Sequence, residues 1–519
     1  MSTFPFPTYR PGQQEALVQA REALAAGKRF VIIEAPTGAG KSAIAVALAQ
    51  EANSSFVVTA QKVLQDQYVR DFPYLSLMKG RANYECLVAP THAAAAPCVV
   101  GKRFPGCEPC PYFTAKDEAM SASVTTMNYA YLLAELNYGG GFKKRDLLIL
   151  DEAHNIENQL MNFVRADISE AQLERAGIPL TLPGHLAPEH VFDFADEVVH
   201  EVSRRVFALG EEVERYPDTR HPAAIEKLRL LQSLESMKRN AEIMLDSLAA
   251  GEAEWVFDVT QTRNGRVLSF KPIDVAAFAE STLFRFGAQV LMLSGTILDV
   301  NNFTRALGID PKEVAYIPVP STFPPENRPI YVRPVAKLDR WNINKHLPVL
   351  LDEIIRIADA HPGEKGIIHT HTYNIAQYIE KHAPRDVRNR IVTHASAEGR
   401  ESAVDAHVSS TEPTILLTPS MTEGLDFAGE LARWQVLCKV PFPFLGDPQI
   451  KKRTERDQGW YEWLTSLRIV QAYGRAVRSE DDYATTYLLD HGFPKFLRRV
   501  RGTLPEWFTE AIMDEAPEN

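Results

Sequence analysis

The sequence lacks the features that mark membrane, secreted and fibrous proteins. No apolar run approaches the roughly 18–20 residues that a helix needs to cross a bilayer. Residues 1–10 contain no basic segment followed by an apolar stretch, so they do not resemble a secretory signal. The chain has no repeat of fixed short period and no low-complexity tract. We therefore expect a globular, cytoplasmic protein without a membrane partner.

An excess of positive charge is also absent. The net charge of −11 argues against a histone-like protein or a protein that coats nucleic acid. It does not exclude a motor that holds a nucleic-acid backbone in a local groove. Basic residues cluster at 451–453 and at 498–501, and either a groove or an ordinary solvated surface explains them.

Cysteine is scarce, and its distribution is uneven. Four of the five cysteines form the pattern C-x11-C-x8-C-x2-C, at Cys86, Cys98, Cys107 and Cys110. Without an export signal, such a cluster favours metal binding over disulfides. Four thiolates suit Zn²⁺ or a [4Fe–4S] cluster, and the spacing alone leaves both open. His92 is a weaker candidate ligand, and Cys438, in an apolar run, is expected to be a small core residue.

Strand and helix patterns alternate at both ends of the chain. A length of 519 residues suggests about three or four domains. Alternating strands and helices predict parallel sheets that are covered on both faces. The expected strands are 29–34, 55–59, 146–150, 290–293, 366–369, 415–417, 434–440 and 487–489, and residues 42–51 are expected to form a helix.

The middle of the chain has a different pattern. Apolar residues recur there at spacings of three and four, which predicts amphipathic helices without strands between them. We interpret residues 160–256 as a helical insertion. Pro324 and Pro325 stand in a proline-dense segment that is typical of a linker between two α/β units.

A phosphate-binding loop follows the first expected strand. Residues 35–42 read A-P-T-G-A-G-K-S and lie between a strand and a helix, which is the context that a P-loop requires. The loop comprises Ala35, Pro36, Thr37, Gly38, Ala39, Gly40, Lys41 and Ser42. Glycines let backbone N–H groups surround phosphate oxygens, Lys41 would reach the β- and γ-phosphates, and Ser42 would ligate Mg²⁺.

Further parts of an ATP-hydrolysing site follow downstream. Asp151 and Glu152, in D-E-A-H, end an apolar strand, where a P-loop enzyme holds Mg²⁺ and orients the attacking water. Gln471, Arg475 and Arg478 lie in Q-A-Y-G-R-A-V-R. Two arginines three residues apart share one helix face and can stabilise transition-state charge, although alone they would also suit a basic surface helix.

The order of P-loop, D-E-A-H, S-G-T at 294–296 and Q-x-x-G-R-x-x-R resembles superfamily 2 helicases. Four stretches narrow the resemblance to XPD/DinG-like iron–sulfur helicases, and most closely to the DinG-like ones. They are K-G-R-A-N-Y-E-C at 79–86, C-P-Y-F at 110–113, T-T-M-N-Y-A-Y-L-L at 125–133 and P-F-P-F-L-G-D-P at 441–448. The helical insertion matches the arch domain of that family in position and helicity, so the resemblance spans about residues 9–492.

The resemblance implies an α/β fold with two RecA-like P-loop motor domains, an iron–sulfur lobe and a helical arch. The corresponding boundaries are 1–79, 112–159 and 257–323 for motor domain 1, 80–111 for the lobe, 160–256 for the arch and 324–519 for motor domain 2. The flanking segments favour a [4Fe–4S] cluster over Zn²⁺, and the lobe would act as a wedge between strands or as a purely structural element.

The resemblance also assigns roles to single residues. Arg10 and Gln13 resemble a motif that reads adenine, and Glu423, Gly424 and Asp426 a motif near the γ-phosphate. Ser294, Gly295 and Thr296 would couple hydrolysis to domain movement. The candidate DNA contacts are Thr59, Gln61, Tyr129, Tyr131 and Phe442, with Phe444 as a further aromatic; core packing is the alternative for each aromatic.

The function that the resemblance implies is an ATP- and Mg²⁺-dependent DNA helicase that moves 5′→3′ in repair, replication or recombination. Its expected partners are single-stranded DNA and forked or 5′-tailed duplexes, with DNA–RNA hybrids and single-strand-binding or repair proteins as further candidates, and it would be a monomer. One alternative is a nucleic-acid-stimulated ATPase that remodels a complex without unwinding. Another is a RecQ-like 3′→5′ helicase, suggested by Y-R-P-G-Q-Q at 9–14.

Overall fold

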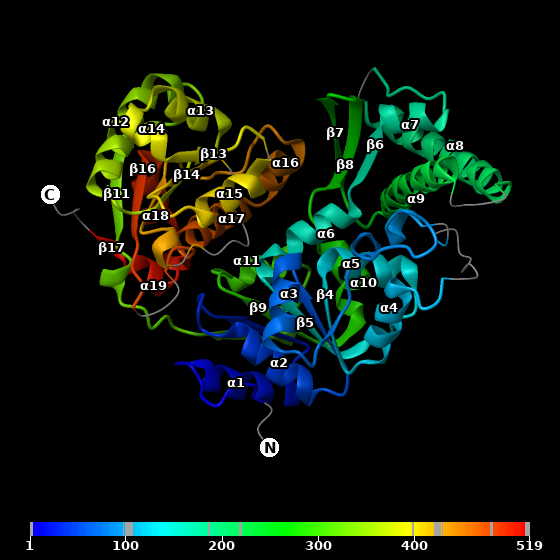
Figure 1. The fold of residues 1–519 in the computed structure, drawn as a ribbon, viewed down its shortest axis with the longest axis horizontal. Coiled ribbons are helices and arrows are strands. Elements are labelled where there is room, and N and C mark those ends of the chain that lie inside the picture. Colours follow the sequence, from blue (N-terminus) through cyan, green and yellow to red (C-terminus); the bar gives the residue numbers. More distant parts are fainter. Residues whose placement is uncertain are drawn as a thin grey trace.

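Two parallel sheets and one inserted unit make up the structure (Figure 1). The structure is a computed structural model that describes residues 4–96, 98, 107–184, 187–216, 221–396, 399–419, 427, 429–477 and 481–513. We call the two sheets with their helices the first and second α/β domains, and residues 166–272 the insertion. Within the described residues, each α/β domain has a seven-stranded sheet in which all pairings are parallel.

The first α/β domain carries the P-loop. Its strands, in spatial order, are β10 Val314–Pro318, β1 Phe30–Glu34, β9 Gly287–Ser294, β5 Arg145–Asp151, β2 Ser55–Thr59, β4 Val124–Asn128 and β3 Ser76–Leu77. Its helices are α1 Gln13–Ala25, α2 Lys41–Glu51, α3 Lys62–Asp71, α4 Pro111–Ser121, α5 Tyr129–Ala134, α6 Ile156–Val164, α10 Ala276–Thr282 and α11 Val300–Ala306. Alternate residues of β1 belong to two separate cores, so both faces of the sheet are covered.

The second α/β domain repeats this architecture. Its strands, in spatial order, are β13 Ile391–Thr393, β14 Ile415–Thr418, β12 Gly366–His369, β15 Trp434–Leu437, β16 Thr485–Asp490, β11 Ile330–Ala336 and β17 Ile512–Met513. Its helices are α12 Ile343–Ala360, α13 Tyr373–His382, α14 Arg385–Arg390, α15 Arg400–Ser409, α16 Pro448–Arg456, α17 Gln458–Tyr473, α18 Gly492–Val500 and α19 Glu506–Thr509. The chain crosses between the sheets after β10, through the segment that contains Pro324 and Pro325.

The fold class predicted from the sequence is confirmed, and each expected strand has a counterpart in β1, β2, β5, β9, β12, β14, β15 or β16. The largest difference lies in the insertion. Besides α7 Glu170–Ala176, α8 Pro188–Glu214 and α9 Pro222–Ala249, it contains an antiparallel sheet of β6 Ala166–Ser169, β8 Gly265–Pro272 and β7 Trp255–Thr262. Strands had not been predicted here, and the boundary at residue 256 cuts through β7.

The missed hairpin has a physical explanation. The burial of strand β7 fades along its length, so only its first two residues are buried. The turn signal is Asn264-Gly265, where Gly265 has a φ of 108°, a value that favours glycine. In Figure 1 the sheet stands beside α8 and α9, which pack against each other.

The helix pair α16–α17 connects all three units. In Figure 1 it lies between the second sheet, strand β7 and helix α11. Four residues of α17, Trp460, Tyr461, Trp463 and Leu467, belong to a core of the first α/β domain. Helix α16 packs against β7 of the insertion. The pair therefore joins the second α/β domain to both neighbours.

Candidate ATP site and cysteine lobe

The parallel sheet brings the sequence motifs of the first α/β domain to one edge. Strands β1, β9 and β5 are neighbours, and Glu34 pairs with Ser294 while Asp151 pairs with Leu293. The P-loop, the D-E-A-H residues and the S-G-T residues therefore follow adjacent strands at their carboxyl ends. The edge gathers segments that are far apart in the sequence.

The P-loop has the conformation that phosphate binding requires. Gly38 and Gly40 have φ values of 86° and 77°, and Gly40 caps helix α2. A Cβ atom on Gly40 would lie 2.3 Å from Nε2 of Gln13, so no other residue fits there without a shift. The Lys41 ammonium donates a hydrogen bond to the Ala35 carbonyl at 3.1 Å. The open backbone and the helix amino terminus form a cradle for anions.

Arg10 and Gln13 contact the loop rather than the cavity beyond it. The Arg10 guanidinium donates to the Gly38 carbonyl, and Nε2 of Gln13 donates to the Gly40 carbonyl at 3.0 Å. The Arg10 backbone N–H in turn donates to Oε1 of Gln13 at 2.9 Å. In this structure the two side chains brace the P-loop backbone, and their role in adenine recognition stays a prediction.

Asp151 is buried beside the P-loop. Its Oδ2 accepts a hydrogen bond from the Tyr68 hydroxyl at 2.9 Å, and its Oδ1 accepts one from the Glu152 backbone N–H at 2.9 Å. Burial, together with the Glu152 carboxylate, raises the pKa of Asp151 to about 6, although Lys41 opposes the rise. A buried carboxylate in this position can hold a divalent cation together with Ser42.

Glu152 has a left-handed backbone conformation, with a φ of 51°. Such a conformation is unfavourable for a residue other than glycine, and it aims the side chain into the cleft. Oε2 of Glu152 lies 3.3 Å from Nδ1 of His154, and that Nδ1 lies 2.9 Å from Oγ of Ser294. The strain thus falls on the residue that was predicted to orient the attacking water.

A chain of hydrogen bonds crosses from the first to the second α/β domain. It runs from His154 to Ser294, whose Oγ accepts a bond from the Thr296 backbone N–H at 3.0 Å. Nε2 of Gln471, at the end of α17, then donates to Oγ1 of Thr296 at 3.3 Å. A Cβ atom on Gly295 would lie 3.7 Å from the Lys41 ammonium. The S-G-T segment therefore contacts both the P-loop and the second domain.

A cavity of about 340 Å³ lies between the two α/β domains. One wall comes from the first domain, with Thr37, Lys41, Gln61 and Glu152. The opposite wall comes from the second domain and includes Gln471, Gly474 and Arg475, with Gln435 and Thr486 from the starts of β15 and β16. Arg478, Glu423, Gly424 and Asp426 lie outside the described residues. The cavity has the size and the charged lining that a nucleotide site needs.

Most of the candidate DNA contacts have buried or half-buried side chains. Tyr129 and Tyr131 are buried: the Tyr129 hydroxyl donates to the Asp151 carbonyl at 3.1 Å, and the Tyr131 hydroxyl lies 3.2 Å from that of Tyr112. Phe442 is half-buried and stacks on Tyr461, with ring centroids 5.6 Å apart. Tyr129 and Tyr131 are therefore core residues in this structure, which was the alternative to base stacking. The side chain of Thr59 is also buried, with its hydroxyl bonded to the Gln61 carbonyl.

The four clustered cysteines gather in the lobe between β3 and α4. All four are free thiols, and Cys107 is buried while the others are half-buried. Burial raises the pKa of the Cys98 thiol, the Arg81 guanidinium opposes that rise, and the other three thiols add to it, so each of these groups lies within electrostatic reach of Cys98. No arrangement of three or more metal-binding side chains is found in the described part of the chain, which lacks residue 97 and residues 99–106 between the second and third cysteines.

The surroundings of the thiols fit an anionic cluster. Arg81 packs its guanidinium over the Tyr112 ring at 4.6 Å. Its Nη1 is buried and has no hydrogen-bond partner among the described residues. A buried, unsatisfied cationic donor beside four thiols suits a group that carries negative charge and accepts hydrogen bonds on sulfur. The Cys438 thiol is buried in the core of the second domain, far from this lobe in the fold.

The two domains, the cavity and the motif residues define the class of protein: an ATP-dependent helicase of superfamily 2. Two family descriptions match the chain, a type III restriction enzyme res subunit at residues 7–176 and a helicase C-terminal domain at residues 354–511. Among solved structures, an XPD helicase has a TM-score of 0.66 at 14% identity, covering 96% of this chain and 98% of the other. Xpd4 of S. tokodaii has a TM-score of 0.58 at 16% identity, covering 97% and 99%.

The curated relatives narrow the assignment. The ATP-dependent DNA helicase YoaA of Escherichia coli is 21% identical over 93% of this chain and 91% of its own length. The ATP-dependent DNA helicase DinG of Photobacterium profundum is 20% identical over 79% of this chain and 70% of its own. Together these matches indicate the XPD/DinG-like family of superfamily 2 DNA helicases. None of the described helices is long and apolar enough to span a membrane.

Proposed function

We propose that this helicase moves 5′→3′ along single-stranded DNA, separates duplexes and acts in DNA repair, replication or recombination. The observation that carries the proposal is the hydrogen-bond chain from His154 through Ser294 and Thr296 to Gln471, because it links the hydrolytic residues to the second domain. The relatives named above as ATP-dependent DNA helicases support DNA as the substrate. Forked and 5′-tailed duplexes are the substrates that we expect.

Each residue of the cavity has a separate role in ATP hydrolysis. The P-loop N–H groups and Lys41 hold the phosphates, and Glu152 orients and deprotonates the attacking water. Arg475, together with Arg478, stabilises the charge that develops on the γ-phosphate. Mg²⁺, held by Ser42 and Asp151, would neutralise charge on the phosphate oxygens when bound. Gln471 of the second domain donates a hydrogen bond to Thr296 of the S-G-T segment. Through this contact, hydrolysis in the first domain would move the second domain.

The four cysteines would hold a [4Fe–4S] cluster, with Zn²⁺ as the alternative. The Arg81 donor and the electrostatic effect of the other three thiols on Cys98 support the anionic cluster. Freshly purified protein should absorb near about 400 nm and contain iron and acid-labile sulfide. Cys110→Ser should lose that absorption, whereas Cys438→Ala, which changes a buried cysteine of the second domain, should keep it. Zinc without iron in protein purified anaerobically would contradict the cluster.

Strand separation by the purified protein alone tests the function against the remodelling alternative. The wild-type chain should displace a labelled strand from a tailed duplex in the presence of ATP and Mg²⁺, and Lys41→Ala should not. ATP hydrolysis that is stimulated by single strands without any displacement would favour an ATPase that remodels a complex. The similarity to helicases named YoaA and DinG favours the proposed 5′→3′ movement over the RecQ-like alternative.

A further inference from the structure

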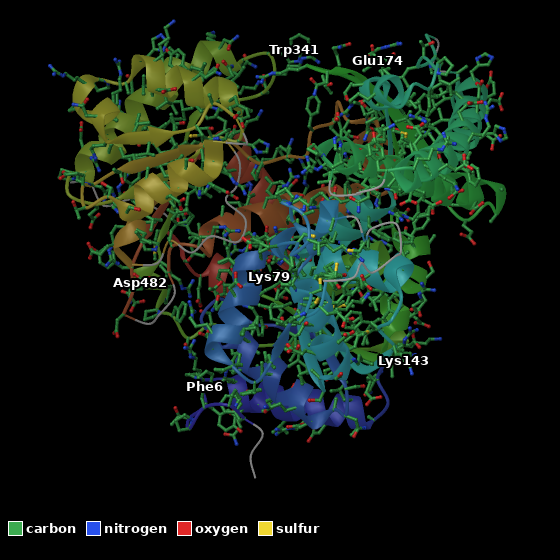
Figure 2. All side chains as sticks on the ribbon, turned by 45° about the vertical axis from the view of Figure 1, so that its right-hand side comes forward. Phe6, Lys79, Lys143, Glu174, Trp341 and Asp482 are labelled. Carbon is green, nitrogen blue, oxygen red and sulfur yellow. The ribbon has the colours of Figure 1, made fainter. Side chains whose placement is uncertain are left out.

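One edge of the second α/β domain presents unusually exposed aromatic rings. The two most exposed large hydrophobic side chains of the described residues are Trp341, at 86%, and Phe444, at 78%. Tyr373, at 39%, lies on the same edge. These residues follow β11, β15 and β12, whose carboxyl ends meet at one edge because the sheet is parallel. Figure 2 shows Trp341 at the upper rim of this domain, on the side of the insertion.

Contacts between the loops make this edge a continuous surface. Nδ2 of Asn374, next to Tyr373, donates to Oδ1 of Asn344 at 3.2 Å and joins the first turns of α13 and α12, the helices that follow β12 and β11. Nε2 of His371 lies 3.2 Å from the Phe442 carbonyl and joins the loops after β12 and β15. The rings are therefore held on a common support. We call this edge, with Trp341, Tyr373 and Phe444, the aromatic rim.

The turn that carries Trp341 is fixed from below. Oδ1 of Asp339 accepts hydrogen bonds from the backbone N–H groups of Trp341 and Asn342, each at 2.9 Å. Nδ2 of Asn342 also donates to that carboxylate. The backbone is thus restrained although the indole ring itself is exposed. A ring on a restrained turn loses little conformational freedom when a flat ligand stacks on it.

The charges around Trp341 favour an anionic ligand. Lys337, Arg340 and Lys345 are exposed on the same segment, and the Arg340 guanidinium lies 5.6 Å from the Trp341 ring centroid. Asp339 is the single acidic residue between residues 337 and 346. Its carboxylate already accepts hydrogen bonds from the turn and lies 3.4 Å from Lys337. Aromatic faces interleaved with cations are the combination that binds the bases and phosphates of a single strand.

We propose that Trp341 stacks on an unpaired base and that the aromatic rim guides the single strand over the second α/β domain. The proposal rests on the proposed function and adds a residue that no sequence motif identified. The rim lies at the carboxyl ends of the strands, whereas Gln435 and Thr486, which line the nucleotide cavity, lie near their amino ends. Changes at Trp341 should therefore alter binding of single strands without altering hydrolysis in the absence of DNA.

Four full-length proteins test the proposal: the wild type, Trp341→Ala, Trp341→Phe and Tyr74→Ala. Tyr74 is 54% exposed on the first domain, at the opposite end of its sheet from the P-loop, and serves as the matched control. Affinity for an oligothymidylate should fall about 5- to 100-fold in Trp341→Ala. Trp341→Phe should retain most of the affinity, Tyr74→Ala should equal the wild type, and affinity for a blunt duplex should stay unchanged in all four.

Fluorescence gives a second readout, because stacking on a base quenches an indole. The wild-type emission should fall when the oligothymidylate binds, and Trp341→Phe should lose most of that change although five other tryptophans remain. Wild-type affinity in Trp341→Ala, or an undiminished quench in Trp341→Phe, would overturn the proposal. It would leave the proposed function intact if the wild type still unwinds DNA. A wild type that binds no single strand would overturn both.

Discussion

The second α/β domain meets its neighbours on two sides that differ in strength. On the nucleotide side, the S-G-T segment and Gln471 are joined by one hydrogen bond of 3.3 Å across the cavity. On the other side, α17 packs Trp460 and Trp463 into the core of the first domain, and α16 forms buried ion pairs. Both contacts lie on α17, so its end near Gln471 faces the cavity through a hydrogen bond while its start is packed into the first domain.

The strong side is built around Arg453. This side chain is only 5% exposed, and its guanidinium lies 2.8 Å from Asp274 and 3.8 Å from Glu157. Nε1 of Trp460 donates to the Glu157 carboxylate at 3.0 Å. Burial raises the pKa of Glu157, and Arg453 opposes that rise. Arg456 and Lys452 add exposed pairs with Glu254 of the insertion.

The largest effect is expected on ATP hydrolysis, when a catalytic residue of the cavity is replaced. Glu152→Gln should lower ATP hydrolysis with saturating single strands about 10²- to 10⁴-fold, because the attacking water loses its base, and should still bind ATP. Lys41→Ala should lose both nucleotide affinity and hydrolysis. Hydrolysis rates and binding of a fluorescent nucleotide separate the two. Wild-type hydrolysis in either variant would contradict the assignment of the site.

The next effect is expected on the stability of the folded chain, when the ion pairs of Arg453 are removed. Arg453→Met should destabilise the folded chain by about 1–3 kcal/mol, because the partly buried carboxylates of Asp274 and Glu157 lose their cation. The neighbouring Arg456→Ala removes only half-exposed pairs and should cost about 0–1 kcal/mol. Denaturant midpoints followed by tryptophan fluorescence compare the two variants. Adding Glu157→Gln should restore part of the loss in Arg453→Met; equal midpoints for both arginine variants would contradict the comparison.

The smallest effect tests the hydrogen bond between Gln471 and Thr296. Gln471→Ala and Thr296→Val each remove the hydrogen bond between these side chains, which is worth about 0.5–1.5 kcal/mol. DNA stimulation of hydrolysis should therefore fall about 2- to 10-fold, whereas stability should hardly change. In the double variant the two losses should not add, since both act on one contact. Fully additive losses would show that the bond does not couple the domains.

Much of the fold could be predicted because its signals are local. The strands β1, β5 and β9 are short apolar runs, and the P-loop needs glycines at fixed positions. Strand β4, with the sequence V-T-T-M-N, was read as part of a motif, because its threonines hide a buried strand. The hairpin β7–β8 was missed because its burial fades along the strand. Long-range pairing, rather than local pattern, decides such elements.

The candidate site was predictable to a similar extent. The motif residues Lys41, Glu152 and Gln471 do line one cavity. Tyr68, whose hydroxyl bonds to Asp151, gave no signal, because a tyrosine in an amphipathic helix has no special spacing. For Tyr129 and Tyr131 the sequence left base stacking and core packing both open, because a sequence does not show which face of an element is buried.

Translocation polarity is the most direct test of the account. The purified protein should be given two duplexes of identical sequence, one with a 5′ single-stranded tail and one with a 3′ tail, together with ATP and Mg²⁺. The account predicts that the labelled strand is released from the 5′-tailed duplex and that the 3′-tailed and blunt duplexes stay paired. Glu152→Gln should release neither. Equal or faster opening of the 3′-tailed duplex would contradict the proposed 5′→3′ movement.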